Sequence, residues 1–347
     1  MTDFTTIDVI APNFKKRLSG VTATVVRLVP IQAREIGIVA TGPVLPDHVP
    51  QIPLAALITM PRDRLRVWHA RRNVEMIAGL ALKHLLRKRL KLVFTSASQR
   101  QQTGLTRWLI RQMDAVVATS DRTAKYLEIP AQVIMHGIDL DDYAPSPDRA
   151  ALRAKLGLPN GTLVGCYGRI RHQKGTDAFI EAMLPAMRQH PDLHALVMGR
   201  ATDKHANYLA ELKTRVAAQG DLAARVHFLP EANVEAMADW YRILDLYVAP
   251  QRWEGFGLTP IEAMACGVPV VATRVGAFEK IVTPDTGLLV PPDEIDALAA
   301  AIDTAIAPPE PFKTWSTNAR PHVAEHFSIQ REANELTTLY RRLLTQS

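Results

Sequence analysis

Short apolar runs alternate with amphipathic stretches along the whole chain. In the first half, we predict strands at residues 7–11, 36–40, 55–58, 65–68, 92–95, 115–118 and 133–135. Helices are predicted between them, including residues 21–29, which Pro30 should stop, and the longer stretch 73–89. Buried parallel strands read as continuous apolar runs, and helices cover both faces of their sheet. The pattern therefore predicts an α/β fold.

The second half repeats this rhythm after a linker at residues 143–159. Its strands are predicted at residues 163–167, 195–198, 226–229, 244–249, 270–273 and 288–290. We therefore expect two doubly wound, Rossmann-like domains, residues 1–145 and 146–328, facing one another across a cleft. The last segment, residues 329–347, is predicted to be a helix that could return to pack on the first domain.

One stretch of the second half combines several signals for a binding site. After the strand at 244–249 comes a turn rich in Gly and Pro, and then a predicted helix start. Thr259 is expected as the N-cap, Pro260 as the first helical residue and Glu262 as the acid of a capping box, and Gly267 should end the helix. A strand, a glycine loop and a helix start direct free N–H groups into one crevice, which favours an anion.

Two carboxylates, Glu254 and Glu262, flank the predicted crevice. Carboxylates repel an anion, but they accept hydrogen bonds from hydroxyl groups. The expected ligand is therefore a phosphate-bearing polyol, such as a sugar nucleotide.

A second loop, residues 168–175, lies between a predicted strand and a predicted helix. Its Arg169 offers a forked donor and its Lys174 a point charge, a pairing that suits a diphosphate. The order Lys-Gly-Thr is the reverse of the Gly-Lys-Thr of a P-loop. The alternative is a solvated basic loop, and the two glutamates in the same half of the chain argue against it.

Composition narrows the class of protein. A hydrophobic content of 47% suffices for two cores, and a net charge of +6 with a pI near 9.4 favours acidic partners. Cys166 and Cys266 fall in separate predicted elements, so free buried thiols in a reducing cytoplasm are expected. The sequence shows neither a secretory signal nor a membrane-spanning segment, which again predicts a cytoplasmic protein.

These motifs together resemble glycosyltransferase family 4. The resemblance rests on Gly168-Arg169, Lys174-Gly175 and the run from Glu254 to Val271, and it covers nearly the whole chain. It implies a retaining, metal-independent enzyme of the GT-B fold without a cofactor. It also implies that Glu254 contacts the donor sugar, Glu262 holds the ribose, and Arg169 and Lys174 hold the diphosphate. The implied donor-binding residues are Gly20, Arg169, Lys174, Glu254, Gly255, Phe256, Gly257, Leu258, Thr259 and Glu262.

The first half supplies the acceptor side in this interpretation. His69 matches the histidine that the family places near the reacting sugar, so it joins Glu254, Arg169 and Lys174 as a catalytic candidate. Arg71 and Arg72 either receive an anionic acceptor or lie at the surface without a ligand. Ser19-Gly20 stands where the family has a glycine-rich loop, and only Gly20 keeps the glycine.

Within the family, residues 67–76 and 94–100 look like lipopolysaccharide core mannosyltransferases, which use GDP-mannose and a Kdo-lipid A acceptor. A different donor, such as UDP-glucose, or another lipid or polysaccharide acceptor is the alternative. The basic end of the predicted helix 73–89 either contacts an anionic membrane surface, which would make the chain peripheral to the cytoplasmic membrane, or is the solvated end of a core helix.

Three other interpretations are disfavoured. Asp139-Leu140-Asp141 matches a metal-binding Asp-x-Asp but lies away from the diphosphate loop, so no metal is expected. A glycoside hydrolase also uses two carboxylates but would have no use for Arg169 and Lys174. A nucleic-acid partner would require stacking aromatics along a basic stripe, and the aromatic content is only 6%.

Overall fold

The computed structural model describes residues 3–15, 20–307 and 312–346. The chain divides into two compact units. Unit 1 comprises Met1–His136 and Ile329–Ser347, and unit 2 comprises Gly137–Ser328. The chain thus enters unit 2 ahead of the expected boundary at residue 145, because Arg320 donates to the carbonyls of Leu140 and Tyr143.

Among the described residues, unit 1 contains a seven-stranded sheet in the order β3-β2-β1-β4-β5-β6-β7, with every pair parallel. The strands are β1 (Val9–Pro12), β2 (Ile38–Thr41), β3 (Gln51–Ile52), β4 (Arg66–Ala70), β5 (Leu90–Ser96), β6 (Ala115–Ala118) and β7 (Gln132–Val133). The helices are α1 (Gly20–Gln32), α2 (Ala56–Thr59), α3 (Asn73–His84), α4 (Gly104–Ile110), α5 (Asp121–Lys125) and α14 (Ile329–Thr345).

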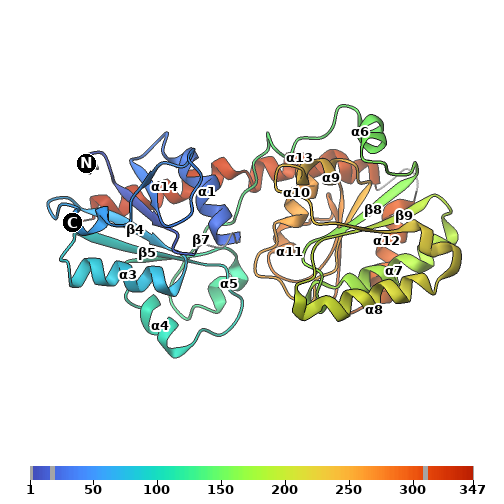
Figure 1. Ribbon diagram of the computed structural model, residues 1–347, viewed down its shortest axis with the longest axis horizontal. Coiled ribbons are helices and arrows are strands. Elements are labelled where there is room, and N and C mark those ends of the chain that lie inside the picture. Colours follow the sequence, from blue (N-terminus) through green and yellow to red (C-terminus); the bar gives the residue numbers. More distant parts are fainter. Residues whose placement is uncertain (1–2, 16–19, 308–311, 347) are drawn as a thin grey trace. The chain divides into compact units, whose positions relative to one another are not determined.

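The sheet of unit 1 is covered on both faces (Figure 1). Val67 and Val93 pack with α1 and α14 on one face. Their neighbours Trp68 and Phe94 pack with α3 and α4 on the other. Successive strand residues point to opposite faces, so this double burial explains the uninterrupted apolar runs of the sequence.

The described part of unit 2 contains a six-stranded parallel sheet in the order β10-β9-β8-β11-β12-β13. The strands are β8 (Thr162–Tyr167), β9 (Leu193–Met198), β10 (Val226–Leu229), β11 (Leu246–Ala249), β12 (Val270–Thr273) and β13 (Gly287–Val290). The α-helices are α6 (Arg149–Lys155), α7 (Thr176–Gln189), α8 (Ala206–Ala217), α9 (Met237–Arg242), α10 (Thr259–Ala265), α11 (Phe278–Ile281), α12 (Ile295–Ile306) and α13 (Phe312–His326). Short 3-10 helices lie at His172–Lys174, Asp203–His205 and Gly220–Arg225. Two parallel-sheet, Rossmann-like domains confirm the predicted fold class.

Several local predictions for unit 1 are wrong. Residues 55–58 are not a strand, since helix α2 starts at Ala56, where the backbone N–H donates to the Pro53 carbonyl. Pro30 does not stop α1, which runs on to Gln32. Proline removes only one helical hydrogen bond near this end, and the buried Leu28 and Val29 hold the turn in place.

Helix α3 ends at His84, earlier than predicted. The chain then turns through Arg87, whose φ of 51° is left-handed, and buries the side chain of Lys88. The Lys88 ammonium donates to the carbonyls of Ile58 and Met60. The expected basic helix end therefore does not exist as one surface, because part of it lies inside unit 1.

Candidate active site

The loop that follows β8 is held against the loop that follows β11. Gly175 has a φ of 70°, and a Cβ atom at this position would lie 2.0 Å from the carbonyl oxygen of Pro250. Only glycine allows this approach, because an L side chain would clash and would strain the backbone. The backbone N–H of Arg252 completes the junction by donating to the Gln173 carbonyl.

Arg252 fastens the two loops through its side chain. Its guanidinium donates to both carboxylate oxygens of Asp177, at 2.7 and 3.1 Å, and to the His172 carbonyl at 2.6 Å. Burial alone would raise the pKa of Asp177, but hydrogen bonds from Arg252 and Tyr208 hold it below its ordinary value. Asp177 is therefore charged at neutral pH, and the ion pair fixes the geometry of both loops.

This junction brings two of the predicted site residues together. The Lys174 ammonium forms an ion pair with the Glu254 carboxylate, and both side chains are largely buried. The second oxygen of Glu254 accepts from the backbone N–H of Gly255 at 3.0 Å. Gly276 packs against the Glu254 side chain. A Cβ atom added to Gly276 would lie 3.1 Å from the Cβ atom of Glu254. The acid is thus fixed from three directions.

Glu262 lies in α10 and accepts a hydrogen bond from the Tyr241 hydroxyl at 2.7 Å. Tyr241 is fully buried, and burial followed by the charge of Glu262 raises its pKa well above the ordinary value. The predicted N-cap at Thr259 is wrong, since the cap falls on Leu258, whose side chain makes no capping bond. The predicted end is right, because Gly267 follows the helix with a φ of 77°.

The remaining donor-side candidates line the same two loops. Gly255 and Phe256 are buried, and Leu258 is half-buried. Gly257 has a φ of 94° and lies so close to Phe278 that a Cβ would come within 2.2 Å of the ring. Arg169 is exposed and makes no hydrogen bond or ion pair with any residue that the structure describes. A guanidinium in that state is available to an anion.

His69 lies at the end of β4 in unit 1 and is completely buried. Both ring nitrogens have partners: Nδ1 is 2.5 Å from the Tyr340 hydroxyl, and Nε2 is 2.7 Å from the Thr95 hydroxyl. Burial and the nearby Arg71 keep the pKa of His69 well below 6.5, so the ring is neutral. Its predicted place beside the reacting sugar stays a prediction.

Arg71 and Arg72 follow β4 and differ in their surroundings. Arg72 is held inward by the fully buried Glu75, at 2.6 Å, and by Asn13 at 2.9 Å. Arg71 is partly exposed and donates to the His69 carbonyl at 3.2 Å. Gly20 is the first residue of α1, whereas Ser19 lies outside the described residues.

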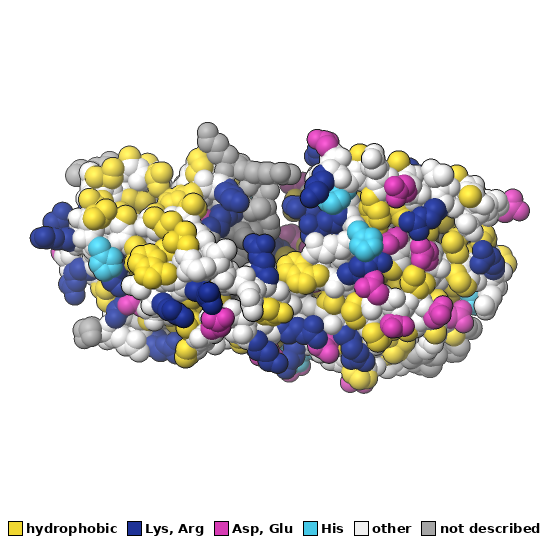
Figure 2. All heavy atoms as spheres, turned by 90° about the horizontal axis from the view of Figure 1, so that it is seen from below, with side chains coloured by type: hydrophobic (Ala, Val, Ile, Leu, Met, Phe, Trp, Pro, Cys, Tyr) yellow, Lys and Arg dark blue, Asp and Glu magenta, His cyan; other side chains and the backbone are white. Residues whose placement is uncertain are grey.

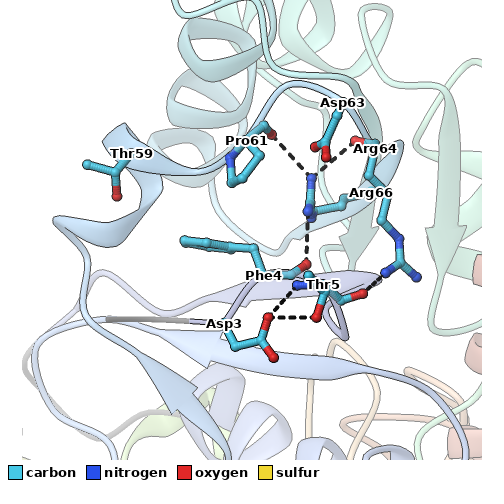
Figure 3. A pocket seen from close by; sticks show the side chains of 8 residues that line it. All are labelled: Asp3, Phe4, Thr5, Thr59, Pro61, Asp63, Arg64 and Arg66. Atoms are coloured by element: carbon cyan, nitrogen blue, oxygen red, sulfur yellow. Dashed lines mark hydrogen bonds between the residues drawn. The ribbon is translucent and has the colours of Figure 1, made fainter.

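A cavity of about 510 Å³ opens elsewhere in unit 1, beside the segments that precede β1 and β4 (Figure 3). Its wall includes Arg66, whose buried guanidinium donates to the carbonyls of Phe4, Pro61 and Arg64. Arg71 and Arg72 follow the opposite end of β4. The cavity is therefore not the candidate site.

Sequence reasoning missed several residues that organise the site. Arg252 lies two residues before Glu254 and Asp177 two residues after Gly175, so both were within reach of a search for paired charges. Tyr340 was not, because 271 residues separate it from His69. Only the fold shows that contact.

Within the described ranges, no group of three or more His, Cys, Asp and Glu side chains is arranged to hold a metal ion. Asp139 of the Asp-x-Asp sequence accepts a hydrogen bond from the backbone N–H of Asp141, at 2.9 Å, in a turn.

Among the described residues, no helix has the length and apolarity needed to cross a bilayer. Burial raises the pKa of the Cys166 and Cys266 thiols to about 12, so both are uncharged.

Comparison with known proteins places this geometry in a family. The family described as "Glycosyl transferases group 1" matches residues 148–322. The chain is 49% identical to the lipopolysaccharide core biosynthesis mannosyltransferase LpsB of Rhizobium meliloti, covering 99% of this chain and all of that protein. It is 48% identical to LpcC of Rhizobium leguminosarum bv. viciae, which carries the same description, with 99% of each chain covered.

A solved structure of Anabaena Alr3699/HepE in complex with UDP shares the fold. Its TM-score is 0.82 at 20% identity, over 97% of this chain and all of that one. The two parallel-sheet domains are thus those of GT-B glycosyltransferases. The chain belongs to the glycosyl transferases group 1 family, and it is an enzyme that transfers glycosyl groups.

Proposed function

We propose that this enzyme transfers mannose from GDP-mannose to a hydroxyl of a lipopolysaccharide core acceptor of the Kdo-lipid A type. One observation carries the proposal: two proteins named lipopolysaccharide core biosynthesis mannosyltransferases are about half identical to this chain over its full length. The likeness extends over both units, so it includes the donor side and the acceptor side. The proposed place of action is the cytoplasmic face of the membrane that carries the lipid acceptor.

The donor binds to unit 2 in this proposal. Glu254 accepts hydrogen bonds from hydroxyls of the donor sugar, and Glu262 accepts them from the ribose. Lys174 and the exposed Arg169 contact the diphosphate. These assignments are supported by the positions of Arg169, Lys174 and Glu254 on two loops that Arg252 and Asp177 hold together. Glu262 lies in α10, the helix that follows the second loop.

The reaction forms a bond between the acceptor oxygen and the anomeric carbon of the sugar while the bond from that carbon to the diphosphate breaks. The leaving diphosphate takes the electron pair of the broken bond, and one of its oxygens accepts the proton that the acceptor hydroxyl loses. Lys174 and Arg169 stabilise the negative charge that develops on the diphosphate, without a metal ion. One preorganised donor of this kind is worth about 3 kcal/mol, or roughly a hundredfold in rate. We propose retention of the anomeric configuration, as in family 4.

The contact between Lys174 and Glu254 has a consequence for binding. In this ion pair each charge partly satisfies the other, which restricts the orientations of both side chains. The incoming donor then meets groups that are already oriented. The ammonium has three donors, so it can contact a phosphate oxygen while it keeps its bond to Glu254.

On the acceptor side, we assign Arg71 to the acidic groups of the acceptor and Arg72 to supporting the loop behind it. Arg71 is partly exposed and lies beside the carbonyl of His69. Arg72 is anchored by Glu75 and positions the loop. His69 is a neutral ring near the carboxyl end of β4. We propose that this end of the strand lies near the reacting sugar.

The test is transfer of label from nucleotide sugars to purified acceptors. The chain is incubated with labelled GDP-mannose or UDP-glucose, together with Kdo-lipid A or a neutral glycolipid. The proposal expects labelled product only from GDP-mannose with the Kdo-bearing lipid. Transfer from UDP-glucose would overturn the donor assignment, and equal transfer to the neutral lipid would overturn the acceptor assignment.

A further inference from the structure

Glu262 is held by a neutral donor, the hydroxyl of Tyr241. This hydroxyl donates to Oε2 of Glu262 at 2.7 Å, and Tyr241 is completely buried. Several other acids of unit 2 pair with cations, as Glu254 does with Lys174. Figure 2 shows basic and acidic side chains next to one another on the surface of unit 2. A neutral hydroxyl differs from an ammonium because it orients a carboxylate without cancelling its charge.

Three tyrosine rings surround the ring of Tyr241. The ring centroids of Tyr167 and Tyr247 lie 5.3 and 5.5 Å from its own, and that of Tyr143 lies 6.1 Å away. All four tyrosines are buried, and they come from β8, β11, α9 and the segment before α6. The Tyr167 hydroxyl donates to the Trp240 carbonyl at 3.1 Å, and the Tyr247 hydroxyl donates to the Tyr167 carbonyl at 3.0 Å. This packing fixes the Tyr241 ring, so its oxygen has a defined position in the core.

The backbone of α10 is held independently of Tyr241. Arg320 in α13 donates to the Ala265 carbonyl at 2.8 Å, and the side chains of Ile261 and Met264 are completely buried. These contacts fix the place of the helix, but they do not fix the direction of the Glu262 carboxylate. Ordering a flexible side chain on binding costs conformational entropy, and the contact with Tyr241 removes part of that cost beforehand.

We infer that Tyr241 is a positioning residue, whose hydroxyl holds one oxygen of Glu262 so that the carboxylate faces the ribose hydroxyls of the bound nucleotide. The inference rests on the proposed function, in which Glu262 accepts hydrogen bonds from the ribose. A carboxylate accepts several hydrogen bonds, so the contacts with Tyr241 and with the ribose are compatible. Burial, followed by the charge of Glu262, raises the pKa of Tyr241 well above its ordinary value, so the hydroxyl stays protonated.

An acceptor fixed at the ribose predicts selectivity between nucleotides. When the ribose hydroxyls are absent, a carboxylate held in place loses the partners that it faces, which weakens binding. We expect the parent to bind a nucleoside diphosphate at least about tenfold more tightly than its 2′,3′-dideoxy analogue. In Tyr241→Phe the carboxylate can turn away, so this ratio should fall to about threefold or less.

Isothermal titration calorimetry measures the ratio for the parent, Tyr241→Phe and Glu262→Ala. The ligands are GDP, UDP and the 2′,3′-dideoxy form of each, so every ratio compares two nucleotides with the same base. The matched control is Tyr247→Phe, which removes a hydroxyl of the same buried cluster that donates to a backbone carbonyl. Tyr247→Phe should keep the ratio of the parent, even if both Phe variants lose the same stability toward urea.

Steady-state kinetics provide a second readout. The ribose does not change during transfer, so losing its contact weakens the ground state and the transition state equally. Tyr241→Phe should therefore raise the KM for the donor about tenfold and change kcat by less than about threefold. Adding Tyr241→Phe to Glu262→Ala should raise the KM no further, because Tyr241 acts through Glu262.

The outcomes separate this inference from the proposed function. If Glu262→Ala lowers the ratio and folded Tyr241→Phe does not, the inference is overturned and the ribose contact of Glu262 stands. A ratio near one in the parent, or binding of neither GDP nor UDP, would overturn the ribose contact and the inference together. Equal losses of selectivity in Tyr241→Phe and Tyr247→Phe would show a general effect of the cluster and would overturn the inference alone. Both variants keep the aromatic ring, and circular dichroism checks that they are folded.

Discussion

The contact between Lys174 and Glu254 places opposite charges on two loops that the chain connects only after 80 residues. We expect Lys174→Ala and Glu254→Ala each to lower turnover about a hundredfold or more, because each removes a preorganised group at the reacting bond. Steady-state kinetics with the labelled donor measure this effect. Lys204→Ala and Glu231→Ala, which alter exposed residues of the same unit, are the controls. Near-normal turnover in folded Lys174→Ala and Glu254→Ala would remove both residues from the site.

His69 gives a prediction about pH. Burial keeps its pKa in the folded chain well below 6.5, so between these two values the unfolded chain binds a proton that the folded chain does not. The contribution of His69 to stability is therefore present above about pH 6.5 and is lost as the pH falls toward the folded pKa.

The measurement compares urea unfolding at several pH values for the parent and for His69→Gln. Glutamine is uncharged, so the variant should lose less stability on acidification. This holds even if its free energy of unfolding is below that of the parent at every pH. The partly exposed His190, replaced by Gln, serves as the control for a general effect of removing a histidine. Parallel pH profiles of parent and His69→Gln would contradict the prediction.

Between elements, the ion pair of Asp177 and Arg252 joins the start of α7 to the loop after β11. Asp177→Asn removes the charge but keeps the shape, so the two loops should separate more easily. We expect the KM for the donor to rise about tenfold and the stability of unit 2 to fall by about 1–3 kcal/mol.

Donor titrations and chemical unfolding provide the two readouts for Asp177→Asn. Glu181→Gln is a matched control, because Glu181 pairs with Arg215 at an exposed position, where an ion pair contributes about 0–1 kcal/mol. Suppose that the KM for the donor is unchanged in Asp177→Asn and that Glu181→Gln keeps the KM and stability of the parent. The junction would then not support donor binding.

Elements with strong local signals were predictable from the sequence. The strands β6 and β11 are uninterrupted apolar runs, and Gly267 ends α10 as its position indicates. The errors arose where contacts distant in sequence decide the local structure. Lys88 is drawn inward by two carbonyls of the α2 segment, and α3 ends before it. Local propensity carries no information about such partners.

The candidate site was also only partly predictable from the sequence. Arg169, Lys174 and Glu254 could be proposed from the sequence because their loops follow strands and have distinctive spacing, and Glu262 because it lies in the first turn of the helix that comes next. The sequence did not show that Lys174 and Glu254 touch, or that Arg252 holds their loops together. It also could not show that His69 is fully enclosed, since its partner Tyr340 comes from the last helix.

For the whole molecule, α14 is essential to unit 1 although it follows unit 2 in the chain. Its Ala333, Leu336, Leu339 and Tyr340 are buried against the sheet and α1. Truncation after Ser328 should therefore unfold unit 1 and leave unit 2 folded. Limited proteolysis followed by mass spectrometry would show this as rapid loss of residues 3–136 and survival of a fragment near 137–328. Equal resistance of both units would contradict the prediction.

Unit 1 is built from two separate parts of the chain, which affects how it folds during synthesis. A ribosome delivers the chain from the N-terminus, so the strands β1, β4 and β5 emerge long before the helix that covers their Val9, Val67 and Val93 side chains. Unit 2 is continuous and can fold during synthesis, whereas unit 1 must wait with an apolar sheet face uncovered until α14 has been translated. Newly made chains should therefore depend on chaperones during that interval, and a ribosome stalled before α14 would hold a half-finished, aggregation-prone domain.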